Sequence, residues 1–333
     1  MTRARELLAR ATNPTATVFI LLVLVFAAVF AMNPGFFAGP SLMAFLKQAA
    51  PLVILAAGQY FVIVSGNFDL SVGALVGAQV VIAARLIDGE ESRTVPVLIV
   101  MALFGIAVGL VNGLITTALK VQSFITTLGM LLVLYGAIRL WTGGAPTGSL
   151  SESFREAGRM GIQDVPVLGQ IPWALLIMLA LGAGAVLLMR TRFGRILMAA
   201  GDNERAAALS GARVDTARTL AFVLSGLSAT VAGVLIGGFA GVSAQVGDGL
   251  EFTVITAVVL GGVVLGGGRG SVLAAMAGAL VIEGLFTLFN QMALPATLRP
   301  AVQGAIIIAA VAYAARARAR PVPTATTASP TPS

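Results

Sequence analysis

The sequence contains no cysteine and no histidine, and charged residues make up only 11% of its 333 positions. The absence of cysteine excludes disulfide bonds and thiol catalysis, and without either residue type the usual ligands of zinc are missing. No group of three acidic residues predicts a metal site either. The glycine-rich stretch at residues 260–271 lacks the Gly-Lys-Ser/Thr ending of a phosphate loop. We therefore predict no catalytic residues, no metal site and no ATP hydrolysis by this chain alone.

Hydrophobic residues instead make up 58% of the chain, whereas soluble domains are roughly half apolar and about a quarter charged. Several apolar runs approach the roughly 20 residues that a membrane crossing needs. Ten runs cover residues 17–32, 42–64, 70–87, 95–119, 124–141, 171–189, 219–241, 252–265, 271–292 and 299–315. The composition predicts an all-α, polytopic membrane protein with about ten transmembrane helices. The run 252–265 is the weakest of these because it is short and broken by glycine.

Arginine and lysine residues predict the orientation, because they gather on the cytoplasmic side of membrane helices. Alternating sides from residue 17 places Lys120, residues 190–218, Arg269 and the tail arginines on the side of the N-terminus. We expect both termini to be cytoplasmic. The net charge of +7 follows the same bias, so we expect surrounding lipid and no nucleic acid as a partner. A cleaved signal peptide is the alternative for the first run, although no clear cleavage site follows it.

The predicted organisation has three parts. Residues 1–16 form a cytoplasmic N-terminal segment, and residues 17–315 form the transmembrane domain. Residues 316–333 are rich in proline, threonine and serine and have little to bury, which predicts a disordered cytoplasmic tail. Within the domain, Gly105, Gly109 and Gly113 recur every four residues, a spacing that favours close helix packing in lipid.

Residues 190–218 are a charged island in this apolar chain, with six arginines and three acids. We predict a short helix within it, with Asp202 as its N-cap and Gly211 as its left-handed end. Glu204 is favourable near the positive end of the helix dipole, and three residues give a small apolar patch. The residues of this predicted helix are Asp202, Asn203, Glu204, Ala206, Ala207, Leu209, Ser210 and Gly211, with the patch at Ala206, Ala207 and Leu209.

Two glycine-containing turns interrupt the apolar runs in a similar way, at residues 65–73 and 260–271. Aligning Ser71 with Ser271 pairs Gly66 with Gly266, which indicates either an internal repeat or chance. Irregular backbone at membrane depth needs protein or water to satisfy its amides, so broken segments are candidate pathway elements. An ordinary tight cytoplasmic turn is the equally weighted alternative.

Glu283 lies about a dozen residues into its apolar run. A carboxyl group at that depth is either functional or protonated and hydrogen-bonded. One such acid, without histidine or a chain of carboxylates, is a poor proton relay. This composition argues against a proton-driven carrier.

Four ordered stretches resemble one family: GNFDLSVGALVG at 66–77, LVNGLITTALKVQSFITTLGM at 110–130, FGRILMAAGDNERAAALSGARV at 193–214 and VITAVVLGGVVLGGGRGSVLAAMAGAL at 254–280. The family is that of the membrane-spanning permease subunits of ATP-binding-cassette importers. The resemblance is to the ribose/xylose/simple-sugar type, within the larger family that includes branched-chain amino acid permeases, and it covers about residues 45–315. Asn67 and Phe68 depart from the family's Gly-Gly-Ile-Asp-Leu-Ser-Val-Gly pattern, and Glu283 stands where a small or apolar residue is usual. These departures leave the substrate open.

The resemblance implies a transport subunit of the bacterial cytoplasmic (inner) membrane that imports a ribose-like sugar by alternating access. The predicted helix at 202–211 would be the coupling helix that docks on a separate ATPase, and that ATPase would bind ATP and Mg. The other implied partners are a second permease copy (homodimer or close paralogue) and an extracytoplasmic sugar-binding protein. A nucleoside, a polyol or a branched-chain amino acid are alternative substrates, and an ion-coupled carrier is the alternative class.

We take the polar and glycine residues of the two turns and of the neighbouring runs as candidates for the translocation pathway. These candidates are Gly66, Asn67, Phe68, Asp69, Ser71, Asn112, Phe124, Thr127, Gly266, Gly267, Glu283 and Asn290.

Overall fold

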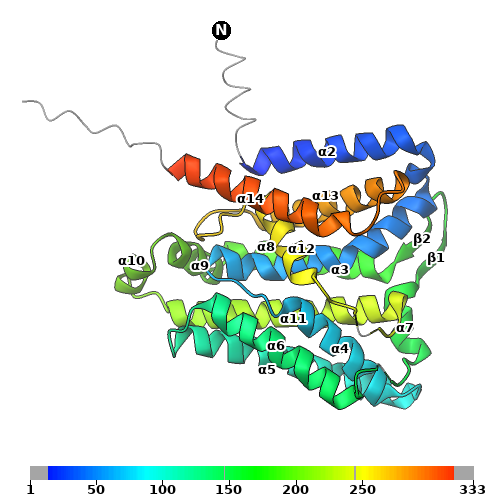
Figure 1. Ribbon diagram of the computed structural model, residues 1–333, viewed down its shortest axis with the longest axis horizontal. Helices are drawn as coiled ribbons and strands as arrows, with labels where there is room; N and C mark the ends of the chain where they lie inside the picture. The colour runs from blue at the N-terminus through cyan, green and yellow to red at the C-terminus, as the bar shows by residue number, and fades with distance from the viewer. Residues whose placement is uncertain (1–13, 146, 244, 319–333) are drawn as a thin grey trace, which may run out of the picture.

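A computed structural model describes residues 14–145, 147–243 and 245–318, and Figure 1 shows it as a ribbon. The helices of the first half are α2 (Pro14–Met32), α3 (Gly39–Val64), α4 (Val72–Ile87), α5 (Thr94–Thr117), α6 (Ser123–Thr142) and α7 (Glu152–Arg159), with short 3-10 helices η1 (Pro34–Phe37) and η2 (Glu91–Arg93). Strands β1 (Gly161–Val165) and β2 (Gly169–Pro172) precede α8 (Trp173–Arg190), α9 (Arg192–Asp202), α10 (Glu204–Leu209), α11 (Val214–Ala240), α12 (Leu250–Leu260), α13 (Val272–Gln291) and α14 (Leu298–Arg318).

The predicted terminal segments lie mostly outside the described residues. Of residues 1–16 only 14–16 are described, and they belong to α2. At the other end α14 continues to Arg318, so the first three residues of the predicted disordered tail are helical. Residues 319–333 lie outside the described part of the chain.

The helices confirm a polytopic helical membrane protein. Six of them, α3, α5 (counted together with η2), α6, α8, α11 and α13, are long and apolar enough to cross a bilayer. Four apolar helices are shorter: α2, α4, α12 and α14, over the residues whose side chains are described. With 11 residues, α12 is about 16 Å long at 1.5 Å per residue, roughly half of the hydrocarbon core. The predicted run 252–265 is thus a short helix followed by a turn, and ten crossings remain a prediction.

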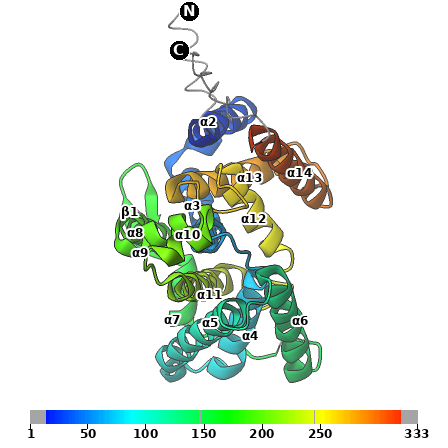
Figure 2. The ribbon, with the colours of Figure 1, turned by 90° about the vertical axis from the view of Figure 1, so that its left-hand side faces the viewer.

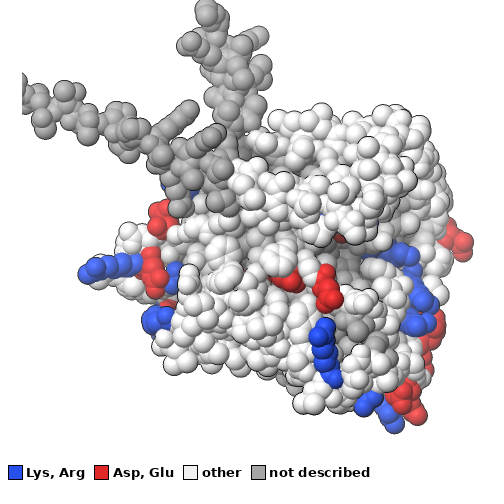
Figure 3. Space-filling view, viewed as in Figure 1, with Lys and Arg blue, Asp and Glu red and all other residues white. Residues whose placement is uncertain are grey.

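Most of the long helices lie side by side with their axes roughly parallel (Figure 1). The end view in Figure 2 shows α10 facing the reader, with α11 and α5 on one side of α3 and α13 on the other. Most charged residues in the view of Figure 3 lie toward the two ends of the helices, and the face between them is mostly white apart from a few acidic and basic side chains near its centre. Large apolar side chains of the long helices are exposed, such as Leu140 of α6 at 87%, as expected for contact with lipid.

Helix α3 lies at the centre of the fold, and every residue from 49 to 64 is buried. On α5, the glycines at positions 105, 109 and 113 pack directly against α11. A Cβ at Gly105 would come within 2.8 Å of the Gly226 carbonyl oxygen, and one at Gly109 within 2.5 Å of that of Phe222. The four-residue glycine spacing therefore brings two backbones together, as the packing interpretation predicts.

The polar link 143–170 differs from the all-α prediction, because β1 and β2 form an antiparallel hairpin at the end opposite α10 (Figure 1). Beside it, Ser151 Oγ caps α7 by accepting from Phe154 N at 3.3 Å. The Glu91 carboxylate accepts from Glu152 N at 2.6 Å and from the Ser153 hydroxyl. These contacts tie the start of α7 to η2 at this end of the molecule.

Candidate functional site

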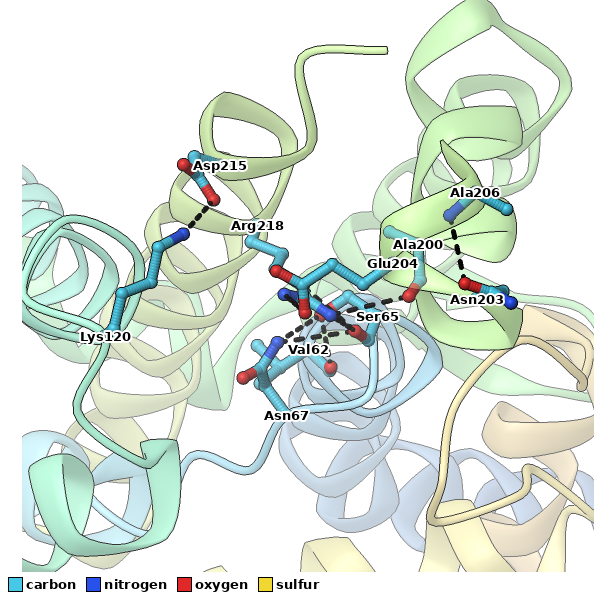
Figure 4. A network of polar contacts seen from close by, with 10 residues as sticks. All are labelled: Val62, Ser65, Asn67, Lys120, Ala200, Asn203, Glu204, Ala206, Asp215 and Arg218. Atoms are coloured by element: carbon cyan, nitrogen blue, oxygen red, sulfur yellow. Dashed lines mark hydrogen bonds and ion pairs between the residues drawn. The ribbon is translucent and has the colours of Figure 1, made fainter. Parts of the chain in front are cut away.

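Helix α10 begins one residue later than predicted. Asp202 is the last residue of α9, because the chain stays helical to that point and Asn203 N donates to Ala199 O at 2.9 Å. The N-cap is Asn203, whose Oδ1 accepts from Ala206 N at 3.0 Å (Figure 4). Gly211 has φ +79°, so the predicted left-handed end is present. The prediction of Asp202 as N-cap was wrong, while the short capped helix itself exists as Glu204–Leu209.

The three residues of the predicted apolar patch do not face the same way: one is buried in the fold and two are exposed. Ala207 is only 6% exposed and packs with Ala200 and Val214. Leu209 is 83% exposed, and Ala206 is also exposed, as are Asn203, Glu204 and Ser210. Helix α10 is therefore anchored through one alanine, with Leu209 presented outward at the end of the molecule.

Arg218 of α11 connects α10 to the centre of the fold (Figure 4). Its Nη1 lies 2.6 Å from Glu204 Oε2. Its Nε and Nη2 donate to Ser65 O at 3.2 and 3.1 Å, and Nη2 also reaches Ala200 O at 3.4 Å. The side chain is 13% exposed. Arg218 is therefore a structural contact within the fold, besides adding to the charge bias that predicts the orientation of the chain.

The two glycine-rich turns meet beneath α10, although they lie about 200 residues apart in the sequence. A Cβ at Gly267 would lie 2.7 Å from Gly201 Cα and 2.7 Å from Gly66 N. Gly268 N donates to Val64 O at 2.8 Å. We call Gly66, Gly201 and Gly267 the glycine junction. It brings the end of α3, the end of α9 and the 261–271 turn into backbone contact. A Cβ at Gly201 or Gly267 would prevent this contact, whereas Gly66 is required for its φ of +85°.

A buried polar network holds the extended segment 65–71 between α3 and α4. Asp69 Oδ1 accepts from Ser71 N at 3.0 Å and from Ser71 Oγ at 2.6 Å, and its Oδ2 accepts from Ser225 Oγ at 2.8 Å. Asn112 Nδ2 donates to Ser71 Oγ at 2.9 Å, and Leu70 N donates to Thr127 Oγ1 at 3.0 Å. These side chains satisfy irregular backbone where water is scarce.

Four of the pathway candidates, Asp69, Ser71, Asn112 and Thr127, belong to this network, and all four are buried. Four others, Gly66, Asn67, Phe68 and Phe124, line a cavity of about 360 Å³ beside α10, together with Glu204 and Arg218. The cavity also includes Thr116, Thr117, Lys120, Val121, Gln122 and Ser123. The structure thus separates the candidates into a supporting network and a cavity wall.

The remaining candidates lie elsewhere. Gly267 belongs to the glycine junction, whereas the neighbouring Gly266 is exposed. Glu283 and Asn290 lie on α13, 11 or more residues beyond its start at Val272, and neither lines the cavity beside α10. Asn290 Oδ1 accepts from Arg299 Nη2 at 2.9 Å. The structure therefore does not bring Glu283 or Asn290 together with the other candidates.

Glu251 is a buried acid that the sequence interpretation missed. It is 5% exposed, and among the described residues its Oε2 has no hydrogen-bond partner. A Cβ at Gly73 would lie 2.2 Å from this oxygen. The signal in the sequence was its position directly before the apolar run 252–265, which places it in the first turn of α12.

These features define an integral membrane protein with two broken segments and a short helix at one end. The chain belongs to the family described as the branched-chain amino acid transport system/permease component, whose model matches residues 41–311. No solved structure matches the chain.

Two similar proteins have named transport systems. The autoinducer 2 import system permease protein LsrC of Klebsiella pneumoniae is 33% identical over 297 residues, 89% of this chain and 85% of that protein. The ribose import permease protein RbsC of Escherichia coli K12 is 33% identical over 294 residues, 88% of this chain and 91% of that protein.

Proposed function

We propose that this chain is the membrane-spanning subunit of an importer that moves a ribose-like sugar into the cytoplasm. A separate ATP-binding-cassette ATPase supplies the energy, and alternating access of this subunit carries the sugar across. The membrane is the bacterial cytoplasmic membrane, with ten crossings and both termini inside. The names of the two similar proteins, one a ribose and one an autoinducer 2 permease, support the substrate class.

The observation that carries this proposal is the position of α10. Its Leu209 projects outward and is 83% exposed, whereas its Glu204 contacts Arg218, which holds the carbonyl oxygen of Ser65. A force applied to the outer face of α10 therefore reaches the start of the extended segment 65–71 through two direct contacts. This arrangement suits a coupling helix that docks on an ATPase.

The proposed assembly has three further components. A second permease copy, identical or a close paralogue, forms the other half of the pathway. An ATPase that binds ATP and Mg docks on α10, and an extracytoplasmic sugar-binding protein approaches the opposite end, where α7 and the β1–β2 hairpin lie (Figure 1). This chain supplies no ATPase site.

Transport assays in proteoliposomes test whether the protein is an ATP-driven importer or an ion-coupled carrier. We expect concentrative uptake of labelled D-ribose or a related sugar only when the ATPase, ATP and binding protein accompany the permease. Sustained uptake by the permease alone under a proton or sodium gradient would contradict the importer and favour an ion-coupled carrier. The same assay with a nucleoside, a polyol and leucine separates the alternative substrates.

The coupling role of α10 has its own test. Leu209→Glu changes the exposed end of α10, and Glu204→Lys places a cation beside Arg218, so we expect both to abolish uptake while membrane insertion persists. ATP hydrolysis should lose its stimulation by the loaded binding protein. Leu119→Glu is the matched control, since Leu119 is 70% exposed in the turn after α5, outside α10 and outside the residues that line the cavity. Normal uptake by both α10 variants would refute the docking role.

A further inference from the structure

The cavity beside α10 has walls from three distant parts of the chain. Residues 66–68 form one wall, the turn between α5 and α6 forms the second, and Glu204 with Arg218 forms the third. Its volume of about 360 Å³ falls within the range of small-molecule sites, roughly 300–1,000 Å³. We propose that this cavity binds a neutral, polyhydroxylated small molecule of the sugar class, reached from the α10 side. The sugar identity of the ligand rests on the proposed function.

The charges of the cavity wall are already compensated. Arg218 pairs with Glu204 at 2.6 Å and Lys120 pairs with Asp215 at 2.9 Å. Arg218 also donates hydrogen bonds from Nε and Nη2 to the carbonyl oxygens of Ser65 and Ala200. An anionic ligand would meet the repulsion of a carboxylate beside each of these two cations, whereas a neutral ligand leaves both pairs undisturbed. The electrostatics therefore favour an uncharged ligand.

Uncharged hydrogen-bonding groups remain in the wall. Asn67 donates through Nδ2 to Ser65, so its Oδ1 is left as an acceptor, and Gln122 is exposed. The Asn67 oxygen can accept from a ligand hydroxyl, and the Gln122 amide can both donate and accept.

Two aromatic rings complete the site. Phe68 is half-buried, and Phe124 is 48% exposed at the start of α6. Aromatic faces together with a few polar groups are typical of small-molecule pockets, and they match the apolar C–H face and the hydroxyl edge of a sugar. A ligand in this position would sit between α10 and the segment 65–68. Sugar that accumulates on the α10 side would then resist the relative movement of these two elements and slow further transport.

The absence of cysteine makes a direct test possible in the full chain, held in lipid nanodiscs. Gln122→Cys places a single thiol on the cavity wall, and its labelling by a maleimide is followed with D-ribose, D-xylose, D-galactose or myo-inositol present. We expect at least one of these probes to slow the labelling fivefold or more at saturation. Leu209→Cys is the matched control, because it lies on α10 but outside the cavity, and its labelling should not change.

A second substitution tests the aromatic part of the wall. Adding Phe124→Ala to Gln122→Cys removes an exposed ring from the cavity, so we expect the half-maximal protecting concentration to rise about fivefold. Phe252→Ala in α12 is the control, because Phe252 is 53% exposed and lies outside the cavity, and it should leave protection as it was.

Three results would overturn the proposal. They are no slowing by any of the four probes, equal slowing at Leu209→Cys, and slowing by inorganic phosphate or D-ribose 5-phosphate without slowing by a neutral probe. If the complex carries out ATP-driven uptake but no sugar protects Gln122→Cys, the cavity is not a sugar site, although the chain is still an importer subunit. If a sugar protects Gln122→Cys but no ATP-driven uptake occurs, the cavity binds sugar and the proposed importer function is wrong.

Discussion

The two glycine-rich turns differ in what holds them. The segment 65–71 is supported by side chains, since Asp69 alone accepts three hydrogen bonds from Ser71 and Ser225. The turn 261–271 is supported by backbone geometry. Gly262, Gly267, Gly268 and Gly270 all have positive φ, and Val264 N donates to Arg269 O at 3.1 Å. The two turns have similar sequence motifs, but their irregular backbones are stabilised differently. A polar side-chain network stabilises segment 65–71, and glycine conformation stabilises the turn 261–271.

The position of each turn explains this difference. Segment 65–71 runs between buried helices, where polar side chains from α5, α6 and α11 can reach it. The turn 261–271 lies against Gly201 and Gly66 at distances that leave no room for side chains. We infer that the first turn is sensitive to the loss of a polar group and the second to the gain of a methyl group.

Removing the central acid of the network should have the largest effect on stability. Asp69→Ala leaves Ser71 N, Ser71 Oγ and Ser225 Oγ without their acceptor, which costs on the order of 3–5 kcal/mol at about 1–3 kcal/mol per unsatisfied buried group. We expect little monodisperse protein after detergent extraction, measured by size-exclusion chromatography. Asp215→Ala removes an acid that is 58% exposed, and this control should behave like the wild type. Normal recovery of Asp69→Ala would show that the network is not essential.

Adding one methyl group to the glycine junction should cause the second-largest loss of stability. Gly267→Ala forces a Cβ to 2.7 Å from Gly66 N at φ +82°, so we expect a loss of about 2–3 kcal/mol from overpacking and backbone strain. The fall in the thermal unfolding temperature measures it. Gly129→Ala is the matched control, because a Cβ there meets nothing within 4 Å and alanine favours a helix by up to about 1 kcal/mol. Equal melting temperatures for both variants would contradict the close contact.

Replacing the connection between α10 and the first turn should affect coupling more than stability. Arg218→Lys keeps the charge but cannot reproduce the contacts to Glu204, Ser65 and Ala200 together, because lysine lacks the planar fork of arginine. We expect a stability loss of about 1–2 kcal/mol and an uptake rate at least tenfold lower in the reconstituted complex. Arg213→Lys, in the exposed link before α11, is the control. Unchanged uptake by Arg218→Lys would show that force reaches the turn by another route.

A milder substitution in the network sharpens the comparison. Thr127→Val removes one acceptor for Leu70 N and keeps the shape of the side chain, so we expect a loss of about 1–2 kcal/mol. The thermal unfolding temperature of the purified protein checks this. Thr142→Val, which removes a hydroxyl bonded only to the previous turn of α6, should change it by less. A larger effect at position 142 would reverse the ranking.

Much of the fold could be predicted from composition and glycine spacing. Each of the ten predicted apolar runs overlaps one of the helices, because burial in lipid requires long apolar helical segments whatever their packing. The existence of the short helix in the island was predictable from its polar start and from Gly211. Its first residue was not, because Asp202 and Asn203 are both good N-caps, and only the length of α9 decides between them. The β1–β2 hairpin was missed because its strands are short and polar.

By itself the sequence determined the class of protein, the approximate helices and the family motifs, since these depend on local composition and order along the chain. Only the tertiary structure decided which polar residues act together. It joined Arg218 to Glu204 and Ser65, brought Gly66, Gly201 and Gly267 into contact, and separated Glu283 from them. The physical reason is that these contacts join positions up to about 200 residues apart, and their partners are selected by backbone approach and burial, which no local pattern records.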